Sequence, residues 1–167
     1  MELVNKVAQS GLITIDLEDF FPKEEILSFD IKDFLFRGLI LKELDFRTIL
    51  KQHDWLKYKD KITAVFCSTD AIIPQWAFML VVTYLSTHTS GIYFGTKEEV
   101  EQKLFLTNLK NIDETKYLNE KIIIKGCGTK IVTGEAYLEI TKKLQPVVKS
   151  LMFGEACSTV PIYKKKV

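Results

Sequence analysis

The sequence is poor in the residues that build disulfide frameworks, and it has no long hydrophobic run. Its 167 residues include three cysteines, four prolines and two histidines. An odd number of cysteines without paired spacing does not fit a disulfide framework, so we expect free thiols in a reducing compartment, the cytoplasm. The longest mostly apolar run, Ala71 to Leu85, is shorter than the roughly 20 residues of a membrane-spanning helix. Met1 to Gln9 lacks the basic start and apolar core of a targeting signal.

An excess of charge of either sign is also missing. Lysine and arginine total 23 and aspartate and glutamate total 22, which leaves a net charge of +1. This balance gives no reason to expect nucleic acid or a membrane surface as the main partner. The apolar fraction of 47% and the charged fraction of 27% are typical of a soluble globular protein, and the length favours one domain.

The second part of the chain alternates between strand and helix patterns. Short apolar or β-branched runs predict four strands, at Lys61–Cys67, Gly91–Gly95, Lys121–Lys125 and Val147–Phe153. Apolar residues at helical spacing predict helices from Gln75 to Thr87, from the Thr96 cap to Leu109, and from the Thr133 cap to the residues before Pro146. Such alternation is typical of parallel βαβ crossovers. We therefore predict an α/β fold: a single three-layer domain with a mainly parallel sheet of about four core strands.

The first 60 residues are less regular, and we expect them to form an N-terminal extension on the alternating region 61–167. Gly11–Leu17 and Glu25–Phe29 fit two further strands, Asp30 fits the cap of a short helix, and Glu43–Gln52 has helical spacing. The helix from Gln75 is apolar on nearly every side, which predicts a buried helix. Residues 154–167 are expected to be a loop with a basic tail, and no internal repeat of useful length is expected.

The three cysteines all follow predicted strands. Cys67 ends the first strand of the alternating region, Cys127 follows the third by two residues, and Cys157 follows the fourth by four residues. In one parallel sheet, all three would lie at the carboxyl ends of the strands, where open α/β sheets place their ligands. Thiolates at this edge could share a metal, with zinc, copper(I) or an iron–sulfur cluster preferred by soft sulfur ligands. The candidates for a fourth ligand are Asp70, Glu155 and His53.

Two other interpretations of the cysteines remain open. They can be buried packing residues, because free cysteine is among the most buried residue types. Alternatively, Cys127 alone is a reactive thiol, and it is the only residue that we would consider catalytic. Gly126 and Gly128 on either side of it allow close approach of another group, and Lys125 and Lys130 would lower the pKa of its thiol.

Several stretches resemble a known family. They are CSTDAIIPQWAFML, KIIIKGCG and LQPVVKSLMFGEACSTVPIYK, with VNKVAQSGLITIDLEDFFP and DFLFRGLILKELDFR nearer the start. The chain is similar over nearly its whole length to an uncharacterised family of small bacterial proteins, labelled as a domain of unknown function. The resemblance implies that Cys67, Cys127 and Cys157 each belong to a family motif. It also implies a link with iron–sulfur cluster assembly genes, and hence iron–sulfur assembly proteins as partners.

These observations lead to one functional expectation and two alternatives. The first is a cytoplasmic metal- or iron–sulfur-binding accessory protein with a three-cysteine site. The second is a non-catalytic α/β module that binds a ligand or a partner and has structural cysteines. The third is a sulfur-transfer protein that uses a reactive thiol. The sequence leaves open whether the protein is an enzyme.

Overall fold

The structure is a computed structural model that describes residues 11–126, 128–155 and 157–166. It divides the chain into two compact units. Unit 1 comprises Met1–Phe21 and Leu104–Val167, and unit 2 comprises Pro22–Lys103. The predicted α/β class with mainly parallel strands is confirmed. The strands, however, form two sheets rather than one.

Unit 2 contains a sheet of three parallel strands in the order β2-β3-β4. Its strands are β2 (Ile26–Asp30), β3 (Ile62–Phe66) and β4 (Gly91–Phe94). Its helices are α2 (Glu43–Gln52) and α3 (Gln75–Leu85), with short 3-10 helices η2 (Ile31–Phe34) and η3 (Leu56–Tyr58). The core forms where buried side chains of α2 and α3 pack on those of β2 and β3, such as Phe46 and Val81 on Phe29 and Val65.

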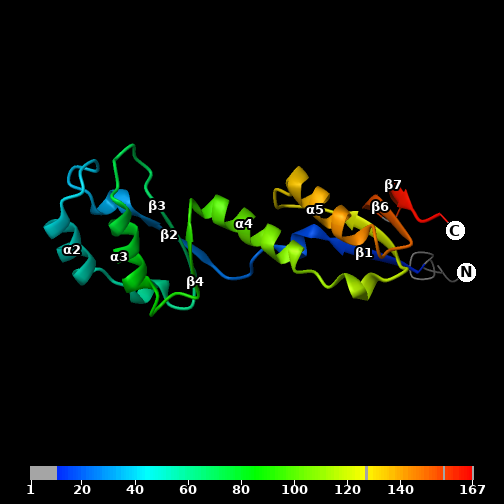
Figure 1. Cartoon of the computed structure of the whole chain (residues 1–167), viewed down its shortest axis with the longest axis horizontal. Helices are drawn as coiled ribbons and strands as arrows, with labels where there is room; N and C mark the ends of the chain where they lie inside the picture. The colour runs from blue at the N-terminus through cyan, green and yellow to red at the C-terminus, as the bar shows by residue number, and fades with distance from the viewer. Residues whose placement is uncertain (1–10, 127, 156, 167) are drawn as a thin grey trace, which may run out of the picture. The chain divides into compact units, whose positions relative to one another are not determined.

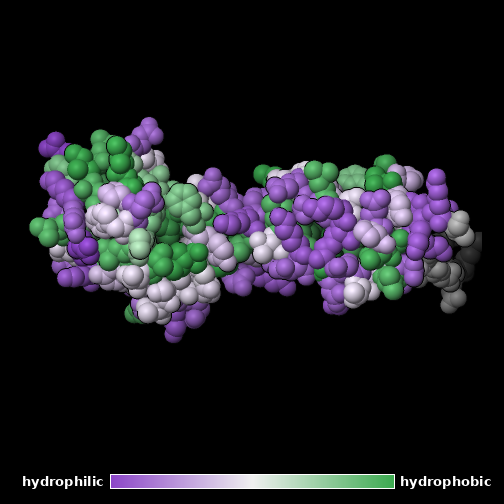
Figure 2. Space-filling view, viewed as in Figure 1, coloured by the Kyte–Doolittle hydropathy of each residue, from purple (hydrophilic) through white to green (hydrophobic). Residues whose placement is uncertain are grey.

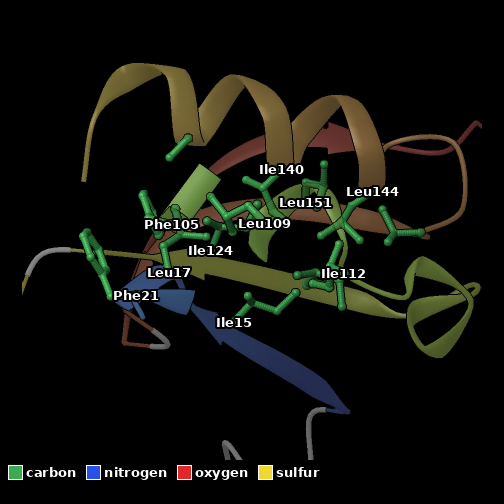
Figure 3. Packing of buried hydrophobic residues seen from close by; sticks show 13 residues of the cluster. Ile15, Leu17, Phe21, Phe105, Leu109, Ile112, Ile124, Ile140, Leu144 and Leu151 are labelled. Carbon is green, nitrogen blue, oxygen red and sulfur yellow. The ribbon is translucent and has the colours of Figure 1, made fainter. Parts of the chain in front are cut away.

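Unit 1 contains a four-stranded sheet in the order β1-β5-β6-β7. Its strands are β1 (Leu12–Asp16), β5 (Lys121–Lys125), β6 (Ser150–Glu155) and β7 (Ser158–Lys164), and only β7 is antiparallel. Its helical segments are η1 (Leu17–Phe20), η4 (Glu114–Tyr117), α5 (Gly134–Leu144) and the second half of α4 (Lys97–Lys110). Figure 3 shows the core side chains of this unit between α5 and the strands. Figure 1 shows the elements along the chain.

The two units repeat one arrangement, which we call the βαβαβ frame. It is β2-α2-β3-α3-β4 in unit 2, and β1, the end of α4, β5, α5 and β6 in unit 1. From the second element onward, equivalent positions are 59 residues apart, as in Asp60 and Asn119, which both have a positive φ (60° and 59°). The Asp60 N–H donates to the His88 carbonyl, and the Asn119 N–H donates to the Val147 carbonyl. The two acceptors, His88 and Val147, are also 59 residues apart.

The sequence carries the same repeat. FRTILKQHDWLKY, which starts at Phe46, and FLTNLKNIDETKY, which starts at Phe105, share seven of thirteen residues. The buried positions of α3 and α5 also correspond at the same spacing: Ala77, Val81 and Leu85 in α3, and Ala136, Ile140 and Leu144 in α5. The prediction that the chain contains no useful internal repeat is therefore wrong.

Most predicted elements are found close to their expected positions. Glu43–Gln52 is a helix with the predicted bounds, and the capping box of α4 forms, because the Thr96 N–H donates to Glu99 Oε2 at 2.8 Å and the Glu99 N–H donates to Thr96 Oγ1 at 3.3 Å. Two predictions about individual elements fail. Residues 158–164 form β7 rather than a loop, and α3 buries only one face, since Met79 is 69% exposed. None of the helices formed by described residues is long and apolar enough to cross a bilayer.

Candidate functional site

The predicted cysteine site does not lie at one edge of a single sheet. Cys67 follows β3 in the three-stranded sheet, whereas Cys157 lies between β6 and β7 of the four-stranded sheet. Cys67 is half-buried against the core of unit 2, and its thiol donates to the Thr69 carbonyl at 3.7 Å. Cys157 is exposed. Cys127 lies outside the described residues. Only the segments after β5 and β6 follow neighbouring strands of one sheet, and Cys67 follows a strand of the other sheet.

The three candidates for a fourth ligand are distributed in the same way. Asp70 is exposed in the loop that also contains Cys67. Glu155 ends β6 and approaches Lys125 Nζ at 3.7 Å. His53 directly follows α2 and is surrounded by aromatic rings, with ring centroids of Trp55, Phe34 and Phe29 at 4.8, 5.1 and 5.7 Å from its own. Among residues 11–126, 128–155 and 157–166, no group of three potential metal ligands comes together.

The charge of Lys125, expected to activate the thiol of Cys127, is compensated by two carboxylates. Lys125 Nζ lies 3.1 Å from Asp16 Oδ2 and 3.7 Å from Glu155 Oε1. The hydrogen bond to Asp16 and the negative charges of Asp16 and Glu155 raise the pKa of Lys125. Its ammonium group therefore stays charged, but it is held by carboxylates on β1 and β6. A reactive Cys127 remains a prediction.

The glycine-rich loop after β5 binds a carboxylate of its own chain. The N–H groups of Thr129 and Lys130 donate to the two carboxylate oxygens of Glu18 in η1, at 3.2 and 3.3 Å. A Cβ atom at Gly128 would lie 2.4 Å from Glu18 Oε1. The glycine is therefore needed for close approach of Glu18. Sequence reasoning recognised that Gly126 and Gly128 permit such an approach, but it did not identify Glu18 as the group.

Strand β4 is an edge of the three-stranded sheet that no described segment covers, and the sequence did not reveal this feature. Strand β4 is the last strand of this sheet and pairs only with β3 among the described residues. Its equivalent in unit 1, β6, pairs with β5 on one side and with the antiparallel β7 on the other. The same position in the frame is thus covered by β7 in unit 1, whereas no described strand covers it in unit 2.

An exposed aromatic ring lies at the β4 edge. Phe94, at the end of β4, is 72% exposed, and its ring contacts Phe78 of α3 edge-on at 5.6 Å. Elsewhere in unit 2, Met79 and Val82 on α3 and Ile72 in the preceding loop are also exposed. Figure 2 shows hydrophobic side chains at the surface of unit 2. Strand β4 and the rings of Phe94 and Phe78 form the candidate functional site, which we call the β4 site.

Comparisons with known proteins give a family but no activity. The model of the family described as "Protein of unknown function (DUF2480)" matches residues 1–165. No match was found among curated proteins. No solved structure matches either. Because the family model covers nearly the whole sequence, the chain belongs to this family of proteins of unknown function.

Proposed function

We propose that the protein is a non-catalytic binding module that takes up an extended segment of a partner protein as an antiparallel strand on β4. The observation that carries this proposal is the difference between β4 and β6. An edge strand presents unpaired N–H and C=O groups, which another chain can use for pairing. In unit 1 the segment 158–164 occupies this position, whereas no described segment occupies it in unit 2.

An aromatic pair that occurs in both units supports the proposal. Phe78 and Phe94 in unit 2 correspond to Tyr137 and Phe153 in unit 1, and both pairs have ring centroids 5.6 Å apart at steep interplanar angles of 68° and 75°. In unit 1, β7 lies beside this pair, with Val160 opposite Phe153. Phe153 is therefore half-buried, while Phe94 is exposed. A strand placed on β4 as β7 is placed on β6 would cover Phe94.

The frame also indicates what the partner segment should contain. By analogy with Val160, the residue opposite Phe94 should be β-branched or apolar, because cross-strand pairs of aromatic and β-branched residues stabilise antiparallel strands. The Gly95 N–H donates to the Val65 carbonyl of β3. Since amide groups alternate along a strand, the N–H groups of Ile92 and Phe94 face away from β3 and are available to the partner.

The test uses peptides as probes on the full chain. Peptides are selected on the purified protein by phage display, synthesised, and added to labelled protein for measurement of amide exchange. We expect slower exchange at Ile92 and Phe94. In Phe94→Glu the affinity should fall about tenfold or more, because a central aromatic anchor is replaced by a charge. The matched control is Leu44→Glu, which alters another highly exposed apolar residue, on α2 (81% exposed), and should leave the affinity unchanged.

Three outcomes would overturn this proposal. The first is protection by the peptides of amides other than those of β4. The second is equal binding to the wild-type chain and Phe94→Glu. The third is a dimer of the chain that Phe94→Glu converts to a monomer, because the occupant of β4 would then be a second copy rather than a different protein.

Metal or iron–sulfur binding is a second candidate function, and in this form it uses two cysteines, Cys127 and Cys157, instead of three. β5 and β6 are neighbours in one sheet, and the segments that contain Cys127 and Cys157 follow these strands. Glu155, beside the second segment, adds a carboxylate. Anaerobic purification followed by metal analysis tests this candidate. We expect Cys127→Ser and Cys157→Ser to lose bound zinc or iron and Cys67→Ser to retain it. A wild-type chain without metal would contradict this candidate and, with it, a role beside iron–sulfur assembly proteins.

A further inference from the structure

Five lysines gather at the edge of the unit 1 sheet where its parallel strands begin. Lys121 starts β5, Lys149 precedes β6, and the antiparallel β7 ends here with Lys164, followed by Lys165 and Lys166. Backbone hydrogen bonds hold these segments together. The Lys165 N–H donates to the Lys149 carbonyl at 3.0 Å, and the Lys149 N–H donates to the Glu120 carbonyl at 2.8 Å. The topology therefore brings together cations that are far apart in the sequence.

The positive charge of this cluster is not balanced by carboxylates of the described residues. Within the described residues, none of the five ammonium groups has a carboxylate within 4.0 Å, whereas Lys61, Lys125, Lys142 and Lys143 all do. The βαβαβ frame does not require these cations either. Ile62 and Ser90 of unit 2 occupy the positions of Lys121 and Lys149. The cluster is thus particular to unit 1.

A cleft with an apolar floor lies among these lysines. It has a volume of about 380 Å³, and Lys121, Lys149 and Lys164 are among the residues that line it. Its apolar lining consists of Leu12, Leu151, Met152, Pro161 and Tyr163. A second cleft of about 380 Å³ shares Lys149 and Lys164 and adds Asn119, Lys165 and Lys166. Volumes in this range are typical of small-molecule sites.

We infer that this lysine-rimmed cleft binds an anionic amphiphile, a small molecule with an apolar body and a carboxylate or phosphate head. The apolar lining removes the body from water, and the ammonium groups pair with the head. A polyanion such as nucleic acid would use the cations without the apolar floor, and the cleft offers only Tyr163 for stacking. The inference is independent of the β4 site, which lies in unit 2.

Octyl phosphate below its micelle concentration is the probe, and binding to the full chain is measured by calorimetry. Octanol and inorganic phosphate test the body and the head separately. We expect octyl phosphate to bind at least about tenfold more tightly than either, because a hydrogen bond to a charged group contributes a tenfold factor or more. The variant Lys149→Gln/Lys164→Gln should lose at least about tenfold in affinity. Lys116→Gln/Lys142→Gln, which alters exposed lysines elsewhere in unit 1, is the matched control and should bind as the wild type does.

Each comparison with octyl phosphate has its own result that would overturn the inference. Equal affinity for octanol shows that the lysines are irrelevant, and equal affinity for inorganic phosphate shows that the apolar floor is irrelevant. Binding to phosphatidylglycerol vesicles without binding to monomeric octyl phosphate indicates attraction to a membrane surface instead of a cleft for a free molecule. Because the altered lysines are exposed, circular dichroism should show that both lysine variants remain folded. A further variant, Met152→Asp, places a carboxylate in the apolar lining of the cleft and should also abolish binding of octyl phosphate.

Discussion

Units 1 and 2 share the βαβαβ frame, and they differ most at the edge strand of the sheet and in the charged residues at its surface. Unit 1 adds β7 to the last strand of the frame, while the sheet of unit 2 has no described strand beyond β4 and exposes Phe94. Unit 1 also carries the lysine-rimmed cleft. Two of its lysines, Lys121 and Lys149, are replaced by Ile62 and Ser90 at the equivalent positions of unit 2. The comparison separates residues that the frame needs in both copies from those that occur in one copy, and the latter are the better candidates for function.

The residues that the frame needs include a phenylalanine at equivalent positions of α2 and α4. Phe46 and Phe105 are both fully buried, and Phe105 stacks on Phe21 with ring centroids 4.0 Å apart. We expect Phe46→Ala and Phe105→Ala each to lower the free energy of unfolding by about 3–5 kcal/mol, because each leaves a cavity in its core. Native-state hydrogen exchange should show lost protection in unit 2 for Phe46→Ala and in unit 1 for Phe105→Ala. Equal loss in both units would show that they unfold together.

A second prediction concerns the loop after β5, which contains Gly126 and Gly128 in unit 1 where the loop after β3 in unit 2 has no glycine. Gly128→Ala would push the Glu18 carboxylate away and break its hydrogen bonds to the N–H groups of Thr129 and Lys130. We expect a loss of about 1–2 kcal/mol in the free energy of unfolding, measured by urea titration, because two modest hydrogen bonds are lost. Gly134→Ala is the control, since nothing lies within 4 Å of its added Cβ, and it should be neutral or slightly stabilising. If Glu18→Ala does not remove the cost of Gly128→Ala, the carboxylate is not its cause.

Local patterns predicted the elements of both units better than their pairing. Helix 43–52 and the strand at Lys121–Lys125 follow from spacing and composition that are visible in a short window. The division into two sheets does not, because β1 pairs with β5, which begins at Lys121, and the whole of unit 2 lies between them in the chain. β7 was missed because Pro161 interrupts its pattern, and proline within a strand is confined to edges and bulges. β7 is the edge strand of its sheet, and the register with β6 shifts near Pro161.

The candidate sites depend on this pairing and were harder to predict. The three cysteines were assigned to one sheet edge on the assumption of a single sheet, and Cys67 belongs to the other sheet. The repeat from Phe46 and Phe105 was the available signal for two copies. Once it is recognised, the sequence alone suggests that the segment after Phe153 has no equivalent in unit 2, because Thr96 and Glu99 begin a helix there instead.

A third prediction tests whether the two copies respond alike. Asp60 and Asn119 have a left-handed backbone conformation that costs most residues free energy and costs glycine little. We expect Asp60→Gly and Asn119→Gly each to raise the free energy of unfolding by about 0.5 kcal/mol, within the range of such backbone effects. Asp60→Ala and Asn119→Ala are matched variants that should be destabilising. Opposite signs for the two glycine variants would show that the positions are not equivalent despite their shared φ.

The smallest expected effect concerns pH and again distinguishes the units. His53 of unit 2 lies among aromatic rings, and burial, followed by the charge of Lys57, lowers its pKa, which the negative charge of Asp54 partly opposes. The Tyr58 hydroxyl lies 3.5 Å from His53 Nε2, and burial raises the pKa of Tyr58 to about 12, so this neighbour stays neutral. Because the unfolded chain then binds the proton more readily than the folded chain, the contribution of His53 to the free energy of unfolding is fully present above about pH 6.5 and is lost as the pH falls through its lowered pKa.

Unit 1 has Ile112 at the equivalent position, 59 residues later, so His53→Ile gives unit 2 the residue that unit 1 has there. Urea titrations at pH 8 and pH 5 should show a smaller loss of stability on acidification for His53→Ile than for the wild type. An identical pH dependence in the two chains would mean that His53 takes up its proton as readily in the folded protein as in the unfolded one.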